Sequence, residues 1–181
     1  IEIEYADNLQ KSVIITEENK QLHITESIPC PGLGKQTPFP KVYIHFSDLN
    51  LIDFKIAGNL STENQLKLDS LFIDVIDVNG NIQLGIDTRK LIVKNHTASV
   101  DFSFSGTADQ IDIYHNGFGT IDASLLQTKR AIIGSNSTGK TYVNVSEIIY
   151  YNINDWGDIH VSGNPQMVNW GHTGTGKLII D

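Results

Sequence analysis

The chain has 181 residues, of which 40% are hydrophobic, and this suits one folded domain, residues 1–181, with a sizeable core. Its formal net charge of −8 repels a nucleic-acid backbone, and no cluster of lysine or arginine offsets that charge locally. No apolar run approaches the roughly 18 to 20 residues that a membrane-spanning helix needs. A disordered protein, a nucleic-acid-binding protein and a helical membrane protein are therefore not expected.

The first 46 residues are expected to form an antiparallel β segment. Apolar and polar residues alternate in residues 1–5, residues 13–15 and 22–24 are predicted as two more strands, and turn residues lie between these stretches. Prolines and glycines interrupt residues 29–40, which predicts a surface loop containing Cys30. Because Cys30 is the single cysteine, it forms neither a disulfide within the chain nor a cysteine-based metal site.

A repeat organises residues 47–181. Apolar runs recur every twenty residues, beginning at Leu71, Leu91, Ile111 and Ala131. In each unit a polar turn and then a small residue introduce a second alternating strand; the small residues are Gly80, Ala98 and Gly119. Such a period is typical of a β-solenoid, whose turns bury their apolar faces by stacking on their neighbours. The predicted fold class is therefore all-β, a parallel β-helix or β-solenoid with turns of about 20 residues and an N-terminal antiparallel β segment.

An apolar stripe is expected on the outside of the solenoid. The residue between two core positions of each first strand should face outward, yet it is polar only at Asp112 and apolar at Phe72, Ile92, Ile132, Ile149 and Val168. Such a stripe does not face water comfortably. Either the strands of residues 1–46 cover it, which is the favoured interpretation, or it contacts a partner or a lipid surface.

Asparagine and histidine recur near one corner of successive turns. A partial hydrogen-bonded ladder is predicted for Asn95, Asn116, Asn136 and Asn152. Turn spacing alone does not make histidines converge with carboxylates on a metal. Solvent exposure is therefore expected for the corner histidines, which are His96, His115 and His172.

Two aspartates give the clearest chemical hint. The repeat places Asp101 and Asp122 at equivalent outward positions of adjacent turns, one strand spacing (~4.8 Å) apart. Two such carboxylates can bind Ca²⁺ or act as general acid and base on a polysaccharide. No lysine or arginine completes a catalytic group, and His160 lies two turns further along. A polysaccharide-active enzyme is therefore an alternative and not the preferred hypothesis.

Aromatic residues are concentrated in the last three turns, as Tyr142, Tyr150, Tyr151, Trp156 and Trp170. Exposed rings would form a platform for sugars, whereas buried rings would close the C-terminal end of the solenoid. Because Trp156 and Trp170 each lie beside a glycine at a corner, burial is the favoured interpretation for these two.

Residues 134–141 match the phosphate-loop pattern G-x-x-x-x-G-K-[ST]. A phosphate loop needs a helix that begins at its lysine, whereas residues 142–145 alternate and contain β-branched side chains, which predicts a strand. We interpret the match as a solenoid corner and expect no nucleotide partner.

Three short segments carry a family resemblance. They are residues 119–125 (GTIDASL), residues 159–165 (IHVSGNP) and residues 174–177 (GTGK). They resemble the head GIN domain family, described as putative autotransporter adhesins of unknown function, although residues 139–143 lack the family's usual Ser-Gly-small turn. The resemblance spans the chain and implies a parallel β-helix-like domain exported by a Gram-negative bacterium, with the signal peptide removed. Family members have been labelled adhesin, lipid-binding or pectinase-like, and the resemblance assigns no catalytic residue.

The preferred hypothesis is an exported, non-catalytic binding protein of the cell envelope, located in the periplasm, on the outer-membrane surface or outside the cell. It recognises a glycan or other surface component through outward side chains, and the candidate residues are Asp101, Asp122, Tyr142, His160, Trp156 and Trp170. The alternatives are the polysaccharide-active enzyme and a lipid-contacting or structural envelope protein that uses the apolar stripe. No cofactor or metal is assigned, and the oligomeric state is left open.

Overall fold

The computed structural model describes residues 1–4, 13–26 and 40–181, which fall into two compact units, Ile1–Ser47 and Asp48–Asp181. The predicted proline-rich loop lies outside these residues up to position 39, and so does Cys30. Every regular element of the described residues is a strand, which confirms the all-β class. Accordingly, this part of the chain has no helix that could span a membrane.

The first unit consists of two separate two-stranded antiparallel sheets, in which β1 pairs with β4 and β2 pairs with β3. Asn19 and Lys20 join β2 to β3 with positive φ angles of 52° and 64°, as a tight hairpin turn requires. The predicted strands are confirmed, but a single meander is wrong, because alternation identifies a strand without identifying its partner. The strands are β1 (Glu2–Glu4), β2 (Val13–Glu18), β3 (Gln21–Glu26) and β4 (Lys41–Tyr43).

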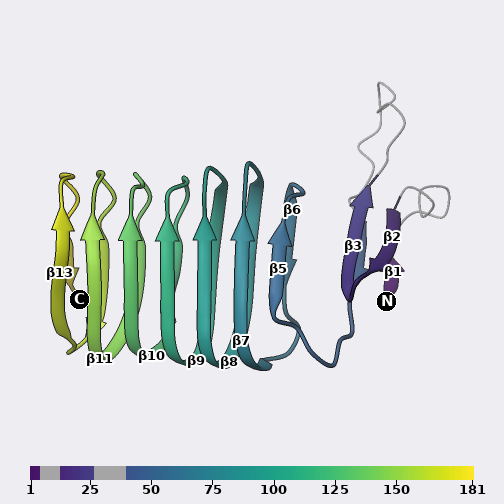
Figure 1. Ribbon diagram of the computed structural model, residues 1–181, viewed down its shortest axis with the longest axis horizontal. Coiled ribbons are helices and arrows are strands. Elements are labelled where there is room, and N and C mark those ends of the chain that lie inside the picture. The colour runs from purple at the N-terminus through teal and green to yellow at the C-terminus, as the bar shows by residue number, and fades with distance from the viewer. Residues whose placement is uncertain (5–12, 27–39) are drawn as a thin grey trace. The chain divides into compact units, whose positions relative to one another are not determined.

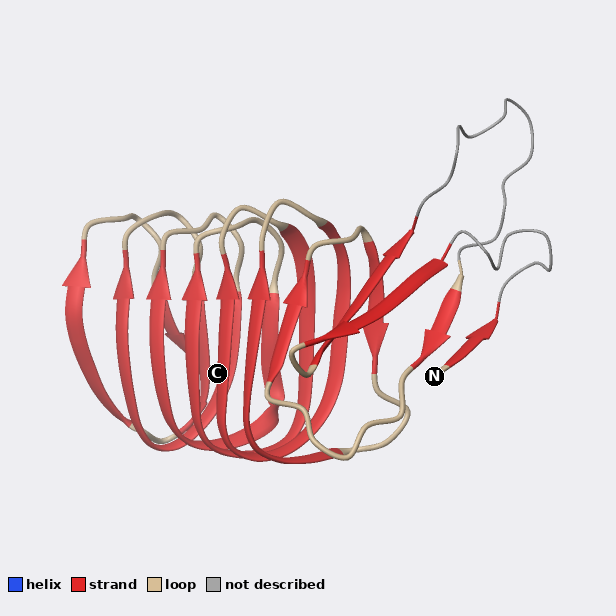
Figure 2. Ribbon diagram, turned by 45° about the vertical axis from the view of Figure 1, so that its right-hand side comes forward, coloured by secondary structure: helices blue, strands red, loops and turns tan. Residues whose placement is uncertain are grey.

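The second unit is a β-solenoid of about six turns, built on one ten-stranded sheet whose strands pair in parallel. The long strands bend at one edge of the solenoid, and short loops close the turns at the other edge (Figures 1 and 2). The strands are β5 (Leu51–Phe54), β6 (Gly58–Ser61), β7 (Leu66–Val75), β8 (Asn79–Asn95), β9 (Ser99–His115), β10 (Ile121–Ser135), β11 (Thr141–Ile153), β12 (Ile159–Gly163), β13 (Gln166–His172) and β14 (Leu178–Ile180).

Each turn has two faces and two corners. Face A contains residues 71–75 and their equivalents in the other turns, and face B contains residues 80–86 and their equivalents. A loop joins face A to face B and is called the loop corner. Face B continues into face A of the next turn through a bend within one strand, called the bent corner (Figure 2).

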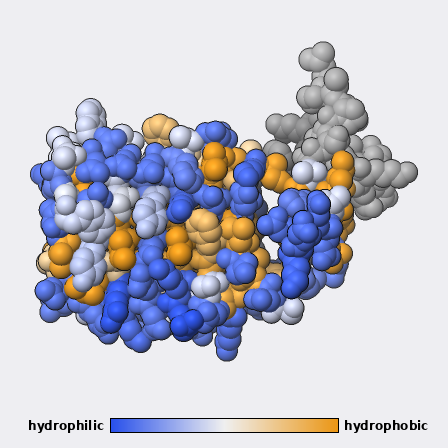
Figure 3. All heavy atoms as spheres, viewed as in Figure 1, coloured by the Kyte–Doolittle hydropathy of each residue, from blue (hydrophilic) through white to orange (hydrophobic). Residues whose placement is uncertain are grey.

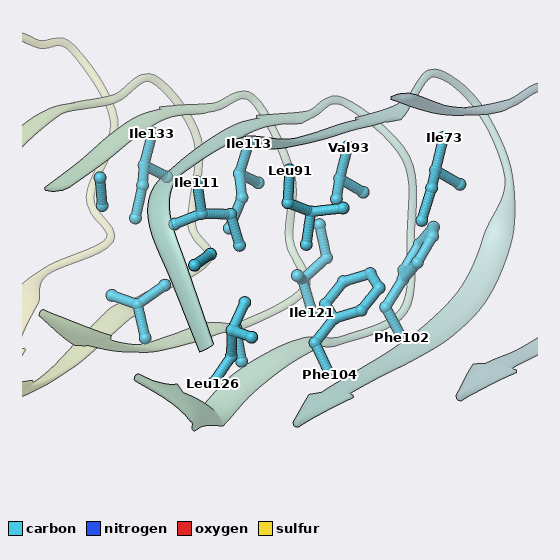
Figure 4. Close-up of a cluster of buried hydrophobic side chains, with 14 of the residues drawn as sticks. Ile73, Leu91, Val93, Phe102, Phe104, Ile111, Ile113, Ile121, Leu126 and Ile133 are labelled. Carbon is cyan, nitrogen blue, oxygen red and sulfur yellow. The ribbon is translucent and has the colours of Figure 1, made fainter. Parts of the chain in front are cut away.

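Alternate side chains of both faces fill the interior. Ile73, Val93, Ile113 and Ile133 are fully buried and occupy neighbouring parallel strands of face A. Figure 4 shows them in one row, with Phe102, Phe104, Ile121 and Leu126 of face B opposite. Burying one such side chain stabilises the fold by roughly 1.5 to 3 kcal/mol. Stacking of the turns therefore generates the core, as the repeat predicts.

The outward residues of face A form a half-buried stripe, with one correction to its membership. Phe72, Ile92, Ile132 and Val168 belong to it, and apolar side chains appear among polar ones on this face in Figure 3. The predicted membership of Ile149 is wrong, because Ile149 is fully buried opposite Ala131 and Tyr150 takes the outward position. This turn is eighteen residues long instead of twenty, which shifts the pattern. The predicted cover by residues 1–46 stays a prediction.

Candidate ligand-binding surface

Three of the predicted ligand-binding residues form one outward column on face B. Asp122 pairs with Tyr142, and Tyr142 pairs with His160, in the register of strands β10, β11 and β12. The rings of Tyr142 and His160 are stacked, with centroids 4.6 Å apart and planes inclined by 23°. The parallel register thus brings together residues that are up to 38 positions apart in sequence.

The contacts of this column limit what it can bind. The imidazole Nδ1 of His160 lies 3.2 Å from Oδ1 of Asp181, and the side chain is only 15% exposed. Asp122 accepts hydrogen bonds from the backbone N–H of Ser124 at 2.9 Å and from its hydroxyl at 2.6 Å. Because His160 covers a face of the Tyr142 ring, the stack presents edges and polar atoms outward more than a free aromatic face.

Asp101 does not join this column, and the predicted carboxylate pair is wrong. Asp122 lies opposite Ser103, whereas Asp101 accepts a 2.7 Å hydrogen bond from the backbone N–H of Thr120. The prediction aligned Ala98 with the glycines that begin the neighbouring strands, but Val100 is the residue opposite Gly80. The two-residue shift therefore places Asp101 and Asp122 diagonally on adjacent strands and not side by side.

Trp156 projects from the loop corner and is 73% exposed, so its predicted burial at the end of the solenoid is wrong. Its backbone N–H donates to Oδ1 of Asp155 at 2.9 Å. Trp156, Thr138 and Phe118 each precede a glycine of one stacked column, and Phe118 is 56% exposed. The two exposed rings therefore lie two turns apart, a spacing of ~9.6 Å.

Residues that follow Trp156 connect it to the Tyr142 and His160 stack. Trp156 and Asp158 lie in the loop corner directly before β12, and His160 is the second residue of that strand. Backbone hydrogen bonds join the adjacent turns here. The N–H of Ile121 donates to the carbonyl of Lys140, and the N–H of Thr141 donates to the carbonyl of Asp158. The loop corner that carries Trp156 thus leads directly into the strand of face B that carries His160.

Trp170 lies elsewhere. It belongs to β13 on face A, at an irregularity in the register between β13 and β11, and is 49% exposed, so its predicted burial is also wrong. The structure therefore does not place Trp170 in the surface that contains Trp156.

A groove at the edge of face A, beside the bent corner, was missed by the sequence prediction and is called the groove on face A. Its volume is about 510 Å³, and it is lined by Gln110, Arg130, Ile132, Glu147, Ile148, Tyr150 and Gln166. The twenty-residue spacing of Gln110 and Arg130 signals that these two share a column, but the position of Tyr150 depends on the shortened turn.

The segment that matches a phosphate loop is a solenoid corner. Strand β11 begins at Thr141, directly after Lys140, which confirms the predicted strand. Gly139 stacks against the backbone of Gly119 in the preceding turn. The helix that would direct N–H groups toward a phosphate is replaced by a strand. Among the residues described, no group of three or more potential metal ligands converges.

Comparisons with known proteins agree with this architecture. The sequence model of the family described as putative auto-transporter adhesin, head GIN domain, matches residues 1–165. A crystal structure of a putative adhesin from Bacteroides fragilis is similar, with a TM-score of 0.83 and 24% identity over 97% of this chain and 79% of the other. At that identity the likeness shows the fold alone. No curated protein matches the chain.

Proposed function

This chain belongs to the family described as putative auto-transporter adhesin, head GIN domain, and on that basis we propose that it is an exported, non-catalytic protein that binds a glycan at the cell surface. The observation that supports glycan binding is the 73% exposure of Trp156 at the loop corner. A large aromatic side chain that leaves its ring in water supplies an apolar face for the C–H groups of a sugar. Tyr142, His160 and Asp122 extend the proposed contact surface along face B.

The arrangement of carboxylates supports a non-catalytic role. Asp122 accepts a hydrogen bond from Ser124, and Asp101 accepts one from the backbone N–H of Thr120. The two aspartates are not opposite each other in the register of their strands. The side-by-side arrangement of carboxylates on which the polysaccharide-active alternative depended is therefore not formed by these two residues.

Polar contacts weaken the lipid-binding alternative. Asp112 interrupts the stripe of face A and is 5% exposed. Its carboxylate oxygens lie 2.8 Å from Nζ of Lys90 and 2.7 Å from Nε2 of Gln110. If the stripe were inserted into a lipid bilayer, this ion pair and its polar surroundings would be buried in hydrocarbon, which is unfavourable.

A glycan array tests the proposal. The wild-type chain is expected to bind at least one glycan class. Trp156→Ala is expected to weaken that binding at least tenfold, because interface hot spots, at which truncation costs about 2 kcal/mol or more, are enriched in tryptophan. Leu125→Ala is the matched control, since Leu125 is apolar and 72% exposed on face B. Absence of binding to every glycan on the array would contradict the proposed function.

A further inference from the structure

The groove on face A crosses four strands in one register. Gln110 of β9 pairs with Arg130 of β10, Arg130 pairs with Ile148 of β11, and Ile148 pairs with Gln166 of β13. Three parallel strand spacings give this column a length of ~14 Å. The groove is therefore long enough for an extended ligand that lies along the solenoid axis.

Its floor is apolar and includes one aromatic ring. Ile132 and Tyr150 are paired in the neighbouring outward column, and Ile148 lies beside them. Tyr150 is 38% exposed, so part of its ring remains accessible. Apolar side chains with a tyrosine ring suit the C–H face of a sugar ring.

The rim carries polar groups of both hydrogen-bonding types. Nε of Arg130 lies 3.5 Å from Oε2 of Glu147, and the two side chains are 62% and 51% exposed. Within the described part of the chain, neither the Gln166 amide nor the Tyr150 hydroxyl has a protein hydrogen-bond partner. The guanidinium donates hydrogen bonds, the carboxylate accepts them and the amide does both, so together these groups can bond adjacent hydroxyls in pairs.

The charge of the rim selects between ligand classes. One guanidinium and one carboxylate cancel, and the nearby Asp112 is neutralised by Lys90. The whole chain carries a net charge of −8, which repels polyanions at a distance. A neutral sugar is therefore favoured over a uronate or sialic acid.

We propose that the face A groove binds a neutral oligosaccharide, with one ring on Tyr150 and its hydroxyls on Arg130, Glu147 and Gln166. The inference rests on the proposed glycan-binding function and adds to it a second site and a ligand class. An apolar peptide or a lipid chain fits less well, because it would leave the polar groups of the rim without partners.

Calorimetric titration with neutral hexasaccharides of glucose, xylose and mannose, beside an anionic hexagalacturonate, tests the groove. Tyr150→Ala is expected to weaken binding of a neutral ligand at least tenfold, and Gln166→Ala, at an exposed position, severalfold. Tyr114→Ala is the matched control, since Tyr114 is 43% exposed on face A outside the groove, and it is expected to change affinity less than twofold.

The outcomes separate the two proposals. Neutral ligands whose binding responds to Tyr150→Ala and Gln166→Ala, but not to Tyr114→Ala, support the groove. If only anionic glycans bind, or if neutral binding responds to Trp156→Ala alone, the groove proposal is overturned and glycan recognition stands. Absence of binding to every glycan overturns both. The chain could also bind vesicles of phosphatidylcholine and phosphatidylglycerol and no oligosaccharide. If Tyr150→Ala removed that vesicle binding, the groove proposal would also be overturned.

Discussion

The two corners of the solenoid are stabilised in opposite ways. Side chains that enter the loop corner form a buried polar column, at most 1% exposed, of Asn95, His115 and Ser135. The bent corner instead carries exposed charges that alternate along the solenoid as Asp69, Arg89, Asp109 and Lys129. A buried corner depends on close fit and on neutral hydrogen bonding, whereas an exposed corner depends on charges that water and salt screen. Changes at the loop corner should therefore have the larger effects.

The largest expected effect on stability comes from the loop corner, where the backbones of adjacent turns approach each other closely. A Cβ on Gly139 would lie 1.7 Å from the carbonyl oxygen of Gly119, whereas a Cβ on Gly85 of face B would have no neighbour nearer than 3.7 Å. Gly139→Ala is expected to lower the free energy of unfolding by at least about 3 kcal/mol, because the backbone of adjacent turns must move apart. Denaturant unfolding measures this, with Gly85→Ala as control. Equal losses in the two variants would contradict the steric explanation.

The second-largest expected effect on stability comes from the burial of His115. This burial was not expected, because the sequence predicted a solvent-exposed corner residue. The Ser137 hydroxyl donates to the carbonyl of Gly117 at 2.6 Å, so it accepts from Nε2–H of His115 at 3.1 Å. The Thr141 hydroxyl, 3.1 Å from Nδ1, then donates to the second ring nitrogen. These contacts suit a neutral imidazole, and burial lowers the pKa of His115 to about 4.

The low pKa predicts a loss of stability in acid. Above about pH 6.5 the ring is neutral in both states, whereas between about pH 6.5 and 4 only the unfolded chain binds the proton. Folding stability should fall by about 3 kcal/mol across that window and lose nothing more from this group below it. Denaturant unfolding of His115→Asn at several pH values should show lower stability at pH 7 and a shallower decline toward pH 4. His172→Asn, exposed in the same column, should keep the wild-type slope.

The same corner shows what the sequence could predict. Burial repeats with the apolar alternation, so the strands, their parallel order and the core were predictable from the period. Register was not, since Ala98 resembles a corner glycine although Val100 occupies that position. The asparagine ladder shows both results. Asn136 bonds Asn116 at 2.7 Å as predicted, but the next member is Asn154, at 2.8 Å, and not Asn152, and Asn95 lies opposite His115 outside the ladder.

The candidate binding surface was less predictable than the fold. The sequence shows where the aromatic residues are, but it does not show whether a residue of another turn covers each ring. His160 stacks on the ring of Tyr142, whereas Trp156 is exposed. The groove of face A depends on the eighteen-residue turn that directs Tyr150 outward. Such features arise from local departures from the repeat, which a regular period cannot reveal.

The bent corner gives the smallest expected effect and completes the contrast. Arg89 donates from Nη2 to Oδ2 of Asp69 at 2.6 Å, and hydrogen bonding to Arg89 lowers the pKa of Asp69. The two side chains are 72% and 69% exposed, so solvent screens their attraction. Arg89→Gln should lower the melting temperature slightly at low salt and not at all near about 1 M NaCl, where the Debye length is about 3 Å. Lys67→Gln removes the same charge from an exposed residue of β7 without breaking an ion pair of the described residues, and thermal unfolding should show no salt-dependent difference for it. A loss in Arg89→Gln that persists at high salt would mean that packing, and not charge, holds the bent corner.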